Sequence, residues 1–155
     1  LQEGFATYYA LLAESEIFGE DYYYWRLYEY AQELLQQDAA DYGISLLNPK
    51  ASSLTFYKQG AWVLHMLREK IGDFHFKKAV KGYLEAYQFK NVETQDFILA
   101  VEKASGIDLS TFTELWLKNK QFSYDQAFNS LKQSKIISEY ILVNCDEDVL
   151  KCQDY

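Results

Sequence analysis

Residues 1–14 read LQEGFATYYALLAE and have the spacing of an amphipathic α-helix. The bulky apolar side chains recur every three or four residues and form one stripe, made of Phe5, Tyr8, Tyr9 and Leu12. Glu3 lies on another side of the helix, on a stripe of small residues that would let a second helix come close: Ala6, Thr7, Ala10 and Ala13. A carboxylate at such a contact is costly unless it is paired, hydrogen-bonded or bound to a metal. The alternative is a solvated Glu3 in the first helical turn, where the helix dipole favours an acid.

Helical periodicity continues along most of the chain. Only seven Gly and one Pro interrupt the 155 residues, so few positions break a helix. We expect further helices at about residues 22–38, 53–71, 73–87, 94–105, 108–117 and 123–132, with N-caps at Thr94 and Ser123. Residues 39–53 form a loop, and residues 138–143 fit either a short strand or a last helical turn. The sequence thus predicts an all-α fold, a helical bundle of six or seven helices. Residues 1–132 form the helical subdomain and residues 133–155 a C-terminal extension of unspecified structure.

Composition and charge exclude several classes of partner. The formal net charge is −8 and the pI is near 4.7, without a basic cluster, which argues against nucleic-acid binding and against anionic membrane surfaces. No run approaches the roughly 18 apolar residues that span a bilayer, so we expect no membrane-spanning segment. Cys145 and Cys152 match neither a zinc knuckle nor a redox motif, and both a disulfide and two free thiols fit their spacing. The compartment stays open.

A second stretch, YKQGAWVLHMLREKIG at residues 57–72, is apolar on nearly all sides and therefore predicts a buried helix. Gly60 in its interior costs about 1 kcal/mol relative to alanine, so we expect it to permit close packing. Tyr57 opens this helix. On position alone, Tyr57 fits a core aromatic residue.

Two stretches together resemble one enzyme family. LQEGFATYY resembles the L-N-E-G-F-A-x-Y segment of the aminopeptidase-N-like zinc metallopeptidases, also called gluzincin aminopeptidases. YKQGAWVLHML resembles the Y-E-K-G-A-x-V-L-x-M-L segment of the same family. Gln2 replaces the usual Asn, and Lys58 and Gln59 replace the common Glu and Lys. Later stretches also read like the family's downstream helices, so the resemblance covers residues 1 to about 117 in order.

The resemblance implies a site and an activity. In that family, zinc is held by the two His of an H-E-x-x-H helix and by a Glu further along the chain, which places a metal-ligand role on Glu3. The family's Tyr donates its hydroxyl to the developing oxyanion, which places a catalytic role on Tyr57. A phenol with an ordinary pKa near 10 is protonated at neutral pH and suits this role. The implied fold is the C-terminal half of a thermolysin-like catalytic domain. The implied function is zinc-dependent hydrolysis of peptide substrates, most commonly as an aminopeptidase.

The 155 residues contain no H-E-x-x-H, so both His ligands and the general base are missing. We therefore expect a fragment of a longer enzyme that needs the upstream remainder of the catalytic domain. This chain alone should be inactive and should not retain zinc. His65 and His75 do not form an i, i+4 pair, and we expect packing or surface roles for both. The alternative is a non-catalytic helical interaction module of a peptidase-like protein that lost its zinc. An H-E-x-x-H upstream and bound zinc in the full protein would indicate the peptidase, and their absence would indicate the interaction module.

Overall fold

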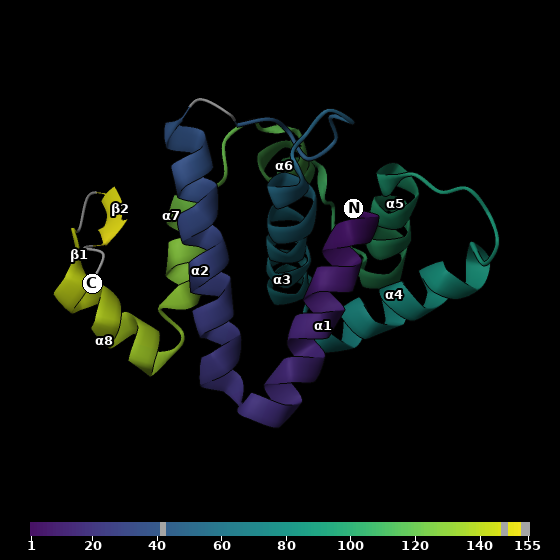
Figure 1. Cartoon of the computed structure of the whole chain (residues 1–155). Helices are drawn as coiled ribbons and strands as arrows, with labels where there is room; N and C mark the ends of the chain where they lie inside the picture. Colours follow the sequence, from purple (N-terminus) through teal and green to yellow (C-terminus); the bar gives the residue numbers. More distant parts are fainter. Residues whose placement is uncertain (41–42, 147–148, 153–155) are drawn as a thin grey trace.

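The protein folds as an all-α arrangement with one short hairpin near its C-terminus (Figure 1). The structure, a computed structural model, describes residues 1–40, 43–146 and 149–152, with side chains described up to Cys145. The helices of these residues are Gln2–Phe18 (α1), Glu20–Ala39 (α2), Gly60–Ile71 (α3), Asp73–Ala86 (α4), Thr94–Ser105 (α5), Ser110–Thr113 (α6), Tyr124–Leu131 (α7) and Lys135–Asn144 (α8). Two π-helical turns, Thr55–Gln59 (η1) and Glu114–Lys118 (η2), precede α3 and follow α6. The predicted fold class is confirmed.

The C-terminal segment adds one helix to the expected number. Residues 138–143, for which the sequence allowed a strand or a helical turn, belong to α8. After α8, the strands Cys145–Asp146 (β1) and Val149–Cys152 (β2) pair antiparallel, with the backbone of Cys145 opposite that of Cys152. Cys145 is disulfide-bonded, which decides between the two states that the cysteine spacing allowed. Tyr140 of α8 packs against Trp25 of α2, with ring centroids 4.9 Å apart. The boundary at residue 132 stays a prediction.

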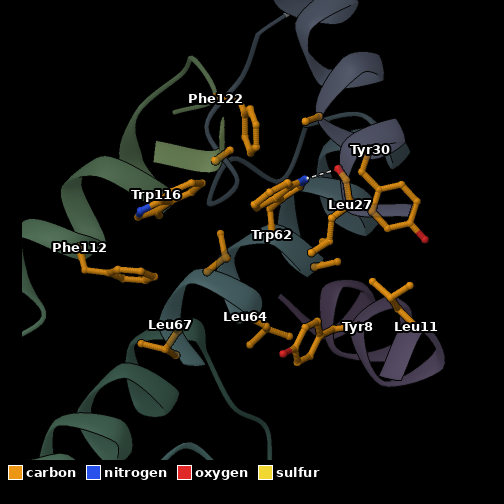
Figure 2. Packing of buried hydrophobic residues seen from close by; sticks show 14 of the residues in the cluster. Tyr8, Leu11, Leu27, Tyr30, Trp62, Leu64, Leu67, Phe112, Trp116 and Phe122 are labelled. Carbon is orange, nitrogen blue, oxygen red and sulfur yellow. Dashed lines mark hydrogen bonds between the residues drawn. The ribbon is translucent and has the colours of Figure 1, made fainter. Parts of the chain in front are cut away.

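Helix α3 is central to the described part of the chain. In Figure 1, α1 and α2 meet at the turn around Gly19, α4 and α5 lie on one side of α3, and α7 and α8 lie on the other. Trp62 of α3 is fully buried, and its indole N–H donates to the carbonyl oxygen of Leu27 at 3.0 Å (Figure 2). The ring centroid of Phe122, between η2 and α7, lies 5.7 Å from that of Trp62 and 5.7 Å from that of Trp116, which connects α3 to η2. The prediction of a buried helix at this position is confirmed.

A buried histidine links three helices. His65 is 4% exposed, and its ring nitrogens lie 2.7 Å from the hydroxyl of Tyr23 on α2 and 2.7 Å from the hydroxyl of Ser130 on α7. Its Nε2 also lies 3.3 Å from Glu69. Each polar group of this network has a partner, as buried polar groups require. His75 is half-buried, with Nδ1 3.2 Å from the carbonyl oxygen of Ile71. Both histidines therefore have packing roles, as predicted.

Three local predictions need correction. The small stripe of α1 faces solvent at Ala6, Ala10 and Ala13, because the close helix contact occurs at another residue, Gly4. The N-cap of α5 is Glu93 rather than Thr94, and the Asp96 carboxylate accepts from the Glu93 backbone N–H at 2.8 Å. Ser123 is the N-cap residue of α7, as predicted, but the expected capping box does not form, because the Ser123 hydroxyl donates to the carbonyl oxygen of Leu115. None of the helices in the part of the chain that the structure describes combines the length and the hydropathy that a membrane span requires.

Candidate functional site

Helix α1 crosses the junction of η1 and α3 at two glycines. A Cβ atom on Gly60 would lie 2.7 Å from the Cα of Gly4, and a Cβ atom on Gly4 would lie 2.6 Å from the Cα of Gly60. Both distances are shorter than real Cβ contacts, so only hydrogen atoms fit between the two backbones. The expectation that Gly60 permits close packing is confirmed, and its partner is Gly4.

This crossing brings Glu3 and Tyr57 together. Glu3 directly precedes Gly4, and Tyr57 lies one helical turn before Gly60. Hydrogen bonding to the Glu3 carboxylate, followed by the negative charge of that group, raises the pKa of the Tyr57 phenol. The direction follows because a neighbouring carboxylate favours the neutral, hydrogen-donating form of the phenol. Two exposed residues that are far apart in the sequence thus lie on elements that meet at the Gly4–Gly60 crossing.

The exposure of Tyr57 rules out a core position for its ring, whereas the exposure of Glu3 is compatible with a solvated acid. Tyr57 is 44% exposed, so the interpretation of Tyr57 as a core aromatic residue is wrong. Glu3 is exposed in the first turn of α1, as a solvated acid at a helix N-terminus would also be. The feature that a solvated acid does not account for is the pairing with Tyr57.

Tyr57 owes its outward direction to the π turn η1. The backbone N–H of Gly60 donates to the carbonyl oxygen of Thr55, five residues earlier. Thr55 and Gln59 are buried in this turn, and Gln37 of α2 donates to the Thr55 hydroxyl at 3.0 Å. Lys58 of the same turn pairs with Glu33 of α2. The turn is therefore fixed to α2, and Tyr57 is left facing solvent. Such π turns are frequent at functional sites.

A largely apolar groove of about 1250 Å³ begins beside Glu3. It is bordered by α1, the loop before η1, α4 and α5, and its lining includes Leu1, Glu3, Phe5, Tyr9, Leu47, Pro49, Phe56, Val80, Tyr83 and Phe97. Leu47 and Pro49 come from the predicted loop at residues 39–53, of which residues 41–42 lie outside the described residues. Glu3 lines the groove, as does Phe56, the residue that precedes Tyr57 in η1.

The described residues offer one ligand for a metal at this place. Among residues 1–40 and 43–145, no three His, Cys, Asp or Glu side chains gather closely enough to hold a metal ion. The exposed Glu3 carboxylate fits one position of a zinc site, which takes three or four protein ligands. The other ligands would have to come from outside this set of residues.

The comparison with known proteins identifies the family of the chain. The profile of the family described as "Peptidase family M1 domain" matches residues 1–116, a stretch that includes Glu3, Gly4, Tyr57 and Gly60. The chain belongs to peptidase family M1. The matched part of this M1 chain ends in η2, so α7, α8 and the hairpin lie beyond it.

Several curated relatives of the M1 chain are aminopeptidases. It is 35% identical to the Aminopeptidase N of Lactococcus lactis over 54% of this chain and 11% of the relative. It is 27% identical to the Aminopeptidase M1-A of Oryza sativa over 90% of this chain and 16% of the relative. Its identity to the Aminopeptidase 2 of Candida albicans is 30%, over 79% of this chain and 14% of the relative. The M1 chain thus spans a small part of the length of these relatives. No solved structure matches it significantly.

Proposed function

We propose that this chain is the helical part of the catalytic domain of a zinc-dependent peptidase of family M1, acting as an aminopeptidase on peptide substrates. The observation that carries the proposal is the Gly4–Gly60 backbone crossing, where the first turn of α1, which contains Glu3, meets the end of η1, which contains Tyr57. The names of the curated relatives support the aminopeptidase activity. We use the term complete enzyme for the proposed longer protein, in which H-E-x-x-H precedes Glu3.

Glu3 is the proposed metal ligand of this chain. Its carboxylate is exposed at the border of the groove, so an oxygen atom is accessible to an ion. Two histidines of the upstream motif would complete the set of protein ligands. Zinc held there would polarise the scissile carbonyl group and lower the pKa of a bound water. The proposed role of Glu3 is to hold and orient the zinc ion.

Tyr57 is the proposed oxyanion donor. A neutral phenol directed at the place where negative charge develops stabilises the transition state more than the substrate. The exposed hydroxyl of Tyr57 is free of core packing, and the π turn fixes its backbone to α2. The pairing with Glu3 supports the role because a donor of this kind must stand beside the metal ligands.

In the proposed domain organisation, residues 1–132 are the helical subdomain of the peptidase catalytic domain and residues 133–155 are a C-terminal extension. The hydrogen bond between His65 of α3 and Ser130 of α7 supports grouping these helices in one subdomain. Tyr140 of α8 packs against Trp25 and Tyr28 of α2.

The isolated chain should not retain zinc. A single exposed carboxylate competes poorly with water for the ion, and metal binding in proteins depends on a complete set of ligands. After dialysis against metal-free buffer, metal analysis should find stoichiometric zinc in the complete enzyme and none in residues 1–155 alone. The chain alone should also leave a peptide substrate uncleaved, because it lacks the general base.

Two results would contradict the proposal. One zinc per isolated chain would mean that these residues build a site without the upstream histidines. A complete protein that holds no zinc and cleaves no peptide would favour a non-catalytic interaction module.

A further inference from the structure

We propose that Gly4 and Gly60 are positioning residues whose backbone contact sets the spacing between the Glu3 carboxylate and the Tyr57 hydroxyl. The catalytic consequence rests on the proposed function, in which Glu3 binds zinc and Tyr57 stabilises the oxyanion. The geometric part of the inference rests on the structure of the described residues alone.

The two glycines are needed for space and not for their backbone conformation. The glycines with positive φ angles among the described residues are Gly19, Gly72 and Gly106. Gly60 is helical, with φ −59° and ψ −40°, a conformation that alanine adopts more readily than glycine. Alanine does not fit at position 60 because its Cβ would lie 2.7 Å from the Cα of Gly4. The backbone atoms in this contact cannot rotate away as the end of a side chain would.

Helix α1 is fixed further along by a buried hydroxyl. Tyr8 is fully buried, and its hydroxyl oxygen accepts from Tyr23 of α2 at 3.3 Å and from Arg68 of α3 at 3.4 Å. This anchor lies about one helical turn beyond Gly4. A methyl group at position 60 should therefore displace the first turn of α1, which carries Glu3, while the part from Tyr8 onward stays in place.

The other side of the pair is fixed as well. Tyr57 belongs to η1, which is held to α2 by the hydrogen bond between Gln37 and Thr55 and by the pairing of Lys58 with Glu33. The first turn of α1 must retreat by several tenths of an ångström before the new methyl group reaches ordinary contact distances of 3.4 Å or more. A misplacement near 1 Å at a reacting centre can lower a rate by about 10²-fold.

A readout that needs neither zinc nor turnover tests the geometry. In the zinc-free complete enzyme, 3-fluorotyrosine is incorporated at position 57, and its ¹⁹F chemical shift reports the neighbouring carboxylate. Glu3→Gln gives the reference shift for loss of that charge. Gly60→Ala should move the resonance in the same direction as Glu3→Gln. Gly82→Ala is the matched control, because Gly82 is an exposed glycine inside α4 whose added Cβ meets nothing within 4 Å. The control should leave the resonance unmoved.

Steady-state kinetics of Gly60→Ala in the original enzyme and in the Tyr57→Phe variant distinguish a positioning role of Gly60 from a general structural role. Gly60→Ala should keep its zinc and a cooperative thermal melt while kcat falls by about 10- to 100-fold. If Gly60 sets the spacing between the Glu3 carboxylate and the Tyr57 hydroxyl, Gly60→Ala in a Tyr57→Phe enzyme, which lacks that hydroxyl, should lower kcat by less than about threefold, because the effects of coupled residues are not additive. Gly82→Ala should retain the original kcat. Gly4→Ala, which fills the contact from the other side, should repeat the pattern of Gly60→Ala.

The inference is overturned by any of three results. One is a folded Gly60→Ala variant with an unmoved resonance and an unchanged kcat. Another is an equal loss of kcat in both backgrounds. The third is loss of folding in both Gly60→Ala and Gly4→Ala while Gly82→Ala folds, which would make the crossing a requirement of the fold alone. Full activity of Tyr57→Phe would refute the proposed function, whereas the ¹⁹F shift would still decide the geometric claim.

Discussion

Glu3→Ala in the complete enzyme is expected to abolish zinc retention and peptide hydrolysis together. The change removes one of three proposed protein ligands, and even the loss of a group that only supports a ligand lowers metal affinity or activity by about 10- to 100-fold. The fold should tolerate the change, because the Glu3 side chain is exposed in the first turn of α1. Metal analysis after dialysis, steady-state kinetics and a thermal melt measure the three quantities.

Glu16→Ala is the matched control for this experiment. Glu16 is another exposed acid of α1, and it lies more than three helical turns from Glu3. Its replacement should leave zinc content and kcat at their original values. A Glu3→Ala variant that retains one zinc and full activity would return Glu3 to the role of a solvated acid at a helix N-terminus.

Tyr57→Phe should lower kcat by about 10²- to 10³-fold, the usual effect of removing one oxyanion donor. KM should change little, because the hydroxyl acts on the transition state and not on the bound substrate. Stability should hardly change, since the substitution keeps the ring and removes only an exposed hydroxyl. Steady-state kinetics on a peptide substrate, together with zinc analysis, gives the result.

Tyr22→Phe is the matched control for Tyr57→Phe. The Tyr22 hydroxyl donates to the carboxylate of Glu14 at 2.8 Å, near the turn between α1 and α2. Removing it takes away the same kind of hydrogen bond far from the Gly4–Gly60 crossing, so kcat should not change. Undiminished kcat in a zinc-replete Tyr57→Phe enzyme would leave Tyr57 without a catalytic role.

Periodicity predicted the helices because their apolar faces are packed in this fold. The helix at residues 53–71 is the clearest case, since apolar residues on nearly all its sides correspond to the buried α3. The stripe of small residues on α1 wrongly predicted a close helix contact there, because small side chains permit such a contact without requiring one. Ala6 and Ala10 face solvent, and the contact is made at Gly4, where even a methyl group would not fit.

The candidate site was less accessible to sequence reasoning. The proposed roles of Glu3 and Tyr57 came from a family resemblance, and nothing in the residue spacing indicates that the two residues would lie close together. Their meeting depends on a tertiary contact between Gly4 and Gly60, which a single sequence does not reveal. The π turn around Tyr57 likewise depends on its attachment to α2 through Gln37 and has no signal in the local sequence.

We propose that Glu3 binds the catalytic zinc of an M1 peptidase and that Tyr57 lies beside it. Anomalous scattering at the zinc absorption edge, measured from crystals of the complete enzyme, tests this arrangement. We expect one strong peak about 2.0–2.2 Å from a carboxylate oxygen of Glu3, in contact also with the two histidines of H-E-x-x-H. The Tyr57 hydroxyl should face the open coordination position. A zinc peak bound by other residues, with the Glu3 carboxylate uncoordinated, would contradict the claim.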